Sequence, residues 1–60
     1  MAMFQVFEDK RGEWRWRLRA NNNEIVATSG EGYVRKASCL HGIELVQTLS
    51  QEAELKETDK

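Results

Sequence analysis

The chain has 60 residues, a mass of 7.0 kDa and a formal net charge of −1, from nine basic and ten acidic side chains. This near balance gives no overall attraction to nucleic acid or to an anionic membrane. No stretch approaches the roughly 20 apolar residues of a membrane span, and no apolar signal segment follows Met1. The single cysteine excludes an internal disulfide framework. We therefore expect one small cytoplasmic domain over residues 1–60, with little stability of its own.

Two segments near the N-terminus have the composition of β-strands. Residues 3–8 are rich in β-forming side chains, and residues 13–19 alternate strictly between apolar and basic ones. This alternation is the period-2 pattern of a half-buried strand. It predicts two faces, with Trp14, Trp16 and Leu18 on one and Arg15, Arg17 and Arg19 on the other.

A three-residue loop at residues 10–12 is predicted between these strands, with Gly12 in the left-handed conformation. This loop sets Val6 opposite Trp16 and Phe4 opposite Leu18, all on one face. A loop longer by one residue would place Phe4 and Val6 opposite arginines, which a half-buried sheet disfavours. The three-residue loop is therefore favoured.

Three asparagines at residues 21–23 predict a second tight turn, because asparagine tolerates positive φ. A third strand follows at residues 24–29. A two-residue turn would direct Ile25 and Ala27 to the tryptophan face, and a three-residue turn would direct Val26 and Thr28 there. We favour the two-residue turn.

A helix is predicted from about Tyr33 or Val34 to Leu49. With about 100° of rotation per residue, its apolar side chains fall on one broad arc, which comprises Cys39, Leu40, Gly42, Ile43, Val46 and Leu49. Glycine within a helix costs about 1 kcal/mol relative to alanine, so Gly42 indicates a close approach to another backbone.

A three-stranded antiparallel meander with one helix on its tryptophan face is a two-layer α+β unit. The residues predicted for its core and for a dimer contact are Phe4, Val6, Trp14, Trp16, Leu18, Leu40, Ile43 and Val46. The apolar groups that find no place in this core are Met3, Phe7, Leu45 and one of the pair Ile25 and Val26, and both sheet edges stay open. A homodimer would cover these groups, so we predict self-association.

Three motifs resemble those of the YegP-like family of small bacterial proteins of unknown function. They are Gly-Glu-Trp-Arg-Trp-Arg-Leu at 12–18, Ser-Gly-Glu-Gly-Tyr at 29–33 and Lys-Ala-Ser-Cys-Leu-His-Gly-Ile at 36–43. The resemblance spans roughly residues 3–46. It implies a βββαβ unit, two copies of which share one sheet and exchange their C-terminal strands. Residues 53–57 would then be a donated strand, whereas the charged composition of residues 50–60 alone favours a frayed tail.

The chain departs from the family at Val34, where serine or threonine usually stands and would cap the helix. We expect the helix start to shift, with fraying there and Gly32 or the Ser29 hydroxyl acting as the cap.

No catalytic, cofactor or metal site is predicted. Cys39 and His41 lie about 200° apart around a helix and cannot form a hydrogen bond. The loop at residues 30–32 matches no phosphate-binding pattern, and its glycines suit a turn with positive φ. The carboxylates of Glu8, Asp9 and Glu13 lie at an exposed hairpin end, where they are expected to stay ionised and idle.

The remaining candidate site is the ladder of Arg15, Arg17 and Arg19, which offers weak binding of nucleic acid or another polyanion. The tryptophans lie on the opposite face and provide no stacking platform beside it. The favoured interpretation is a solvated face whose arginines pair with Glu8, Glu24 or the acidic C-terminal segment. We expect a non-enzymatic homodimeric interaction or accessory module without cofactors, and polyanion binding is the alternative.

Overall fold

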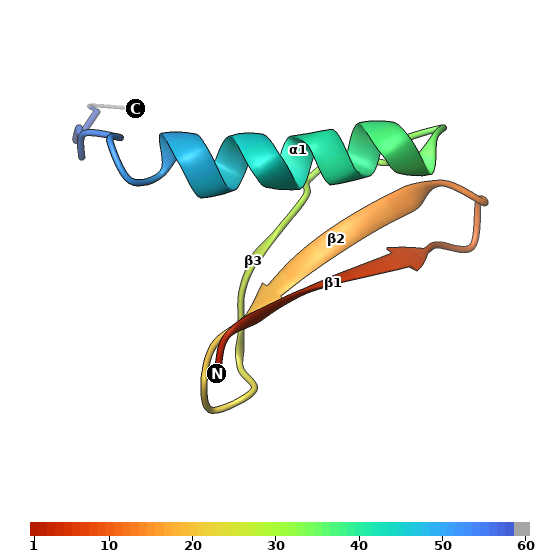
Figure 1. Ribbon diagram of the computed structural model, residues 1–60, viewed down its shortest axis with the longest axis horizontal. Coiled ribbons are helices and arrows are strands. Elements are labelled where there is room, and N and C mark those ends of the chain that lie inside the picture. The colour runs from red at the N-terminus through yellow and green to blue at the C-terminus, as the bar shows by residue number, and fades with distance from the viewer. Residues whose placement is uncertain (59–60) are drawn as a thin grey trace.

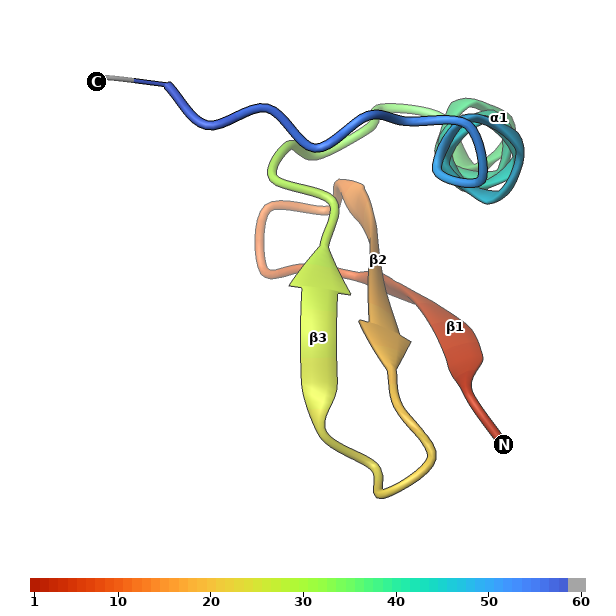
Figure 2. The ribbon, with the colours of Figure 1, turned by 90° about the vertical axis from the view of Figure 1, so that its left-hand side faces the viewer.

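The computed structural model describes residues 1–58 and contains three strands followed by one helix. The elements are β1 (Met3–Glu8), β2 (Trp14–Arg19), β3 (Ile25–Thr28) and α1 (Lys36–Leu49). The strands form one antiparallel sheet in the order β1-β2-β3, and α1 lies across one face of it (Figure 1). The predicted meander with a single helix is confirmed. Residues 53–58 follow without regular structure and are exposed (Figure 2).

The first hairpin has the predicted register. Val6 pairs with Trp16 and Phe4 with Leu18, and the loop of residues 10–12 contains Gly12 at a φ of 81°. Asp9 stabilises this loop through both its backbone and its side chain. Its backbone N–H donates to the Glu13 carbonyl at 2.8 Å, and its carboxylate accepts the backbone N–H groups of Arg11 at 2.9 Å and Glu13 at 3.0 Å. The chain therefore fixes this register through both its turn and its apolar alternation.

The second hairpin corrects the favoured two-residue turn. The Ala20 N–H donates to the Glu24 carbonyl at 2.8 Å, so the loop comprises three residues and ends at Asn23 with a φ of 73°. A β-bulge then inserts one extra residue into β3. Because of the bulge, Ala27 lies on the tryptophan face opposite Leu18, as predicted for that face, whereas Ile25 pairs with Arg19 on the other face.

Backbone pairing with β2 continues beyond β3 and keeps Tyr33 out of the helix. The Trp14 N–H donates to the Tyr33 carbonyl at 2.7 Å, and the Tyr33 N–H donates back at 2.8 Å. Helix α1 consequently begins at Lys36, two to three residues later than predicted, and its N-cap Arg35 makes no side-chain capping bond. The Ser29 hydroxyl does not serve as the cap, because it accepts the Trp16 N–H at 3.4 Å and donates to the Glu31 carbonyl at 2.9 Å.

The core lies where β2 meets α1. Its buried apolar members are Trp16, Cys39 and Ile43. The half-buried side chains packed around them are Phe4, Val6, Trp14, Leu18, Ala27, Tyr33 and Val46. The Phe4 ring meets the Trp16 ring edge-on, with centroids 5.4 Å apart. Leu40 is 45% exposed and therefore lies outside the core of the single chain.

Candidate functional site

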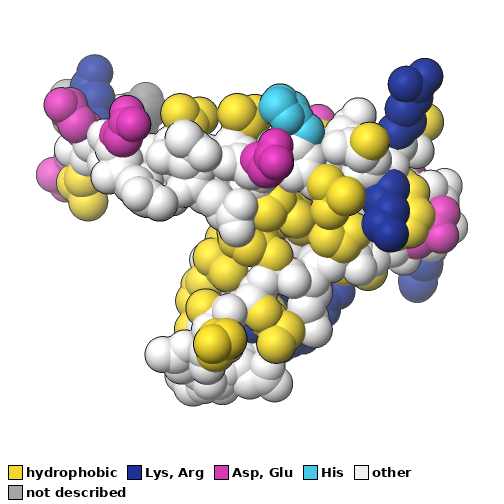
Figure 3. Space-filling model, in the orientation of Figure 1, with side chains coloured by type: hydrophobic (Ala, Val, Ile, Leu, Met, Phe, Trp, Pro, Cys, Tyr) yellow, Lys and Arg dark blue, Asp and Glu magenta, His cyan; other side chains and the backbone are white. Residues whose placement is uncertain are grey.

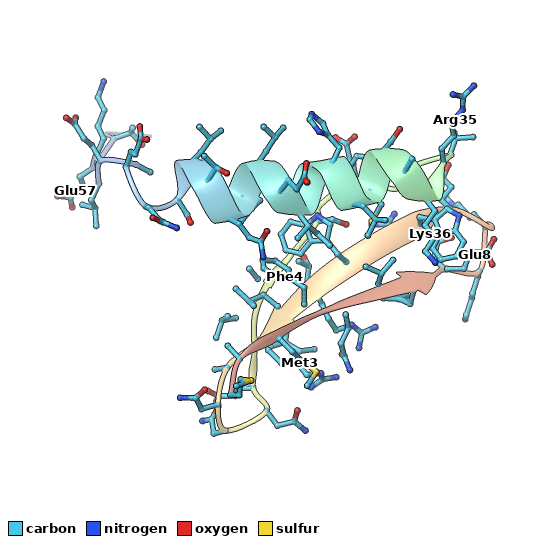
Figure 4. All side chains as sticks on the ribbon, in the orientation of Figure 1. Met3, Phe4, Glu8, Arg35, Lys36 and Glu57 are labelled. Carbon is cyan, nitrogen blue, oxygen red and sulfur yellow. The ribbon has the colours of Figure 1, made fainter. Side chains whose placement is uncertain are left out.

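The predicted arginines share the sheet face that points away from α1. In the antiparallel register Arg15 pairs with Phe7, Arg17 with Gln5 and Arg19 with Met3, and directly paired residues share a face. We call this set of six residues the arginine face. Figure 4 shows the alternation on β1, where Phe4 points toward α1 and Met3 points to the opposite side.

Each guanidinium of this face is held by a neighbour. Arg15 donates from Nε to Asp9 Oδ2 at 2.6 Å, and Arg19 donates from Nε to Gln5 Oε1 at 2.7 Å. Arg19 also donates from Nη1 to the Asn23 carbonyl at 2.8 Å. The Arg17 guanidinium lies 4.1 Å from the centre of the Phe7 ring, which is a cation–π contact. The ladder is therefore an ordered surface.

The Asp9–Arg15 pair sets the local electrostatics. The hydrogen bond from Arg15 and the backbone N–H groups of Glu13 and Arg11 hold the pKa of the Asp9 carboxyl below its usual value. The same hydrogen bond raises the pKa of Arg15. Asp9 is accordingly ionised, as expected, and its carboxylate accepts three hydrogen bonds within the hairpin. Within residues 1–58 no ion pair joins an arginine of this face to Glu8, Glu24 or the C-terminal segment, so that predicted pairing is not observed.

Sequence analysis missed Phe7 as a member of this surface. Its ring is half-buried on the arginine face because Phe7 pairs with Arg15. The signal was present in the predicted register, since any loop that sets Val6 opposite Trp16 also sets Phe7 opposite Arg15. An aromatic ring therefore does lie beside the arginines, although the tryptophans do not.

Cys39 and His41 lie apart, as predicted. The Cys39 thiol is fully buried, and this burial raises its pKa. The His41 ring is exposed, with its Nδ1 3.8 Å from Glu44 Oε1 on the same helix. A buried protonated thiol and a distant imidazole cannot form a nucleophile–base pair.

The loop before α1 is explained by packing. A side chain at Gly32 would overlap Glu13, so this glycine allows a close approach and does not supply the predicted positive φ. Among residues 1–58 no group of three or more histidine, cysteine, aspartate or glutamate side chains could hold a metal ion.

The described part of the chain also contains no helix with the length and apolar character needed to cross a membrane.

The fold and this face define a small two-layer α+β domain with arginines on the open side of its sheet. Residues 9–57 match a domain of unknown function, DUF1508. A UPF0339 protein of Neisseria meningitidis is 43% identical over 54 residues, covering 90% of this chain and 95% of the relative. A UPF0339 protein of Agrobacterium fabrum is 52% identical over 54 residues, covering 90% and 86%. The chain belongs to the DUF1508 family, which confirms the predicted resemblance, and the function of that family is unknown.

Solved structures confirm the α+β architecture. The solution NMR structure of a protein from Haloferax volcanii is similar with a TM-score of 0.88, 42% identity and 95% of each chain covered. That of a protein from Agrobacterium tumefaciens gives a TM-score of 0.76 and 36% identity, covering 95% of this chain and 90% of the other.

Proposed function

We propose that the protein is a non-enzymatic interaction or accessory module that works as a cytoplasmic homodimer. The carrying observation is the apolar surface that one chain leaves uncovered. Large apolar side chains of α1 are 44–57% exposed, namely Leu40, Leu45 and Leu49. Figure 3 shows further hydrophobic side chains gathered in the angle between α1 and the sheet. Apolar side chains gathered in this angle favour a contact with another protein chain.

The C-terminal segment supports a dimer that shares one sheet. Leu55 is 95% exposed and residues 53–58 form no regular structure in the single chain. Strands β1 and β3 each pair on one side only within the described chain. Unpaired strand edges accept an added strand readily. We infer that residues 53–57 of each chain add to the sheet of the other and bury Leu55.

A non-enzymatic role agrees with the chemistry of the described residues. The one thiol is buried with a raised pKa, and the one imidazole lies on the exposed side of α1. A free buried thiol also suits the reducing cytoplasm.

Sedimentation velocity of the full chain, at protein concentrations from about 1 to about 100 µM, tests the dimer. We expect a folded species of twice the 7.0 kDa chain mass. Burial of a leucine contributes about 1.5–3 kcal/mol, so Leu55→Asp should weaken dimerisation at least about tenfold. Thr58→Asp adds the same charge outside the proposed strand and should change it by less than about threefold. A stably folded monomer throughout this range would refute the proposal.

A further inference from the structure

We propose that the arginine face binds the backbone of single-stranded nucleic acid. This binding site lies on the face of the sheet that points away from α1, whereas the proposed dimer contact uses the helix side of the sheet and the strand edges. The ladder is a charged feature that neither the core nor the proposed dimer contact employs.

The spacing of the arginines suits an extended phosphate chain. Alternate residues of a strand are about 6.6–6.8 Å apart, and Arg15, Arg17 and Arg19 occupy three such positions along β2. Successive phosphates of an extended single strand repeat at a comparable interval.

The guanidiniums are already positioned for such a ligand. Arg15 and Arg19 are both held through Nε, by Asp9 and Gln5. Among residues 1–58 this leaves both Nη groups of Arg15 and the Nη2 group of Arg19 without an acceptor in the protein. Binding therefore immobilises little additional side-chain freedom, which is one of the main costs of association.

Arg17 and Phe7 add a stacking surface. The guanidinium lies 4.1 Å above the ring centre, so the two groups form a layered pair on the open face. Bases of single strands stack on aromatic rings and on guanidinium planes. Exposed Met3 and Ile25 lie at the margin of the same face and provide further apolar contact for bases.

Charge also favours an anionic occupant. The face carries three arginines, and within the described chain only Arg15 has an acidic partner, Asp9. Glu8 pairs with Trp14 and so projects to the opposite face, and the Glu24 carboxylate accepts from the Asn22 amide at 3.4 Å. An excess of positive charge remains on this face, although the net charge of the whole chain is −1.

The test is fluorescence anisotropy of a labelled 12-nucleotide oligothymidylate with the full chain at low salt. We expect the logarithm of the binding constant to fall with the logarithm of the salt concentration at a slope of about −2. Each phosphate contact to a single strand contributes about 0.7 to this slope, and the face carries three arginines. A duplex of the same length should bind at least about threefold more weakly, because its paired and stacked bases cannot stack on Arg17 and Phe7. Arg17→Ser with Arg19→Ser should reduce the affinity about tenfold or more and bring the slope near −0.7.

A matched control removes two charges elsewhere. Arg11→Ser with Arg35→Ser changes the net charge equally, and both side chains are exposed and outside the arginine face. This control should lose less than about threefold in affinity. Circular dichroism confirms the fold of each variant, and Arg17→Lys with Arg19→Lys replaces the serine pair if that pair unfolds. The lysine pair should keep the salt slope but lose affinity, because lysine lacks the planar group.

Nuclear magnetic resonance of the unmodified protein gives an answer that needs no variant. On addition of the oligonucleotide, the Nε–H signals of Arg15 and Arg19 should shift, while the buried indole signal of Trp16 stays in place. The proposal is overturned by any of three results: no binding at low salt, equal loss in the serine pair and its control, or tighter binding of the duplex. If the oligonucleotide binds only after Glu52, Glu54 and Glu57 are changed to glutamine, the natural occupant of the arginine face is the acidic C-terminal segment, and the proposal is overturned.

Discussion

The side chain of Tyr33 lies directly against the backbone of α1 at Gly42. A Cβ atom at position 42 would lie 2.7 Å from the Tyr33 hydroxyl oxygen and 3.3 Å from its Cζ atom. Because Tyr33 is also bonded to Trp14 through two backbone hydrogen bonds, this contact fixes the distance between the helix and the sheet.

Gly42→Ala should destabilise the protein despite the intrinsic preference of helices for alanine. The helix gains about 1 kcal/mol from the change, but overpacking against the fixed tyrosine ring costs about 1–3 kcal/mol. We expect a net loss of up to about 2 kcal/mol in urea unfolding. In a Tyr33→Phe background the nearest oxygen is absent, so the same substitution should cost less or become stabilising. An equal cost in both backgrounds would show that the hydroxyl is not the obstacle.

Ser29→Ala should destabilise the sheet. Ser29 is buried, and its hydroxyl is the acceptor for the backbone N–H of Trp16. Without it that N–H loses its partner next to the core, at a cost of about 1–3 kcal/mol. Ser38→Ala, at an exposed helix position, serves as the control and should change the urea midpoint little. Equal effects at the two positions would contradict the role of the buried hydroxyl.

Asn23→Ala should lower stability by about 1 kcal/mol, because an L-residue with a Cβ and no local polar group is strained in the left-handed region. Asn23 has a φ of 73°, while none of its neighbours in the loop has positive φ. Asn23→Gly should be neutral or stabilising by a few tenths of a kcal/mol. Asn21→Ala is the matched control in thermal unfolding, and a cost there as large as at Asn23 would count against the strain argument.

The Asp9–Arg15 pair should make the first hairpin sensitive to acid. The pKa of Asp9 is lower in the folded chain than in the unfolded chain. The unfolded state therefore binds the proton more readily, and stability falls as pH drops. The contribution is complete above the unfolded-state pKa and is lost as pH falls through the lower folded value. The measurement is the midpoint of urea unfolding at a series of pH values. Asp9→Asn should reduce the fall of this midpoint at acid pH, whereas Glu8→Gln should leave the fall unchanged.

Local pattern was enough to predict the first hairpin. The alternation of tryptophan and arginine fixes which way each side chain of β2 points, and a register shifted by one residue would bury arginines. The same pairing also placed Phe7 beside the arginines, although its importance emerged only when the Arg17 guanidinium was found on its ring.

The second hairpin and the helix start were predicted less well for a physical reason. Two adjacent apolar residues, Ile25 and Val26, allow either face, and the bulge that decides between them depends on tertiary fit. Likewise, the backbone of Tyr33 bonds to Trp14, nineteen positions earlier in the chain, and this keeps it out of the helix.

The order of residues by itself determined the two faces of the sheet, the first turn and the amphipathic helix, because these follow from side-chain periodicity over a few residues. The tertiary structure alone decided the bulge in β3, the late helix start and the contact of Tyr33 with Gly42. The late helix start depends on hydrogen bonds to Trp14, nineteen positions earlier, and the other two features depend on how the strands and the helix pack together. The periodicity of a few residues does not encode such contacts.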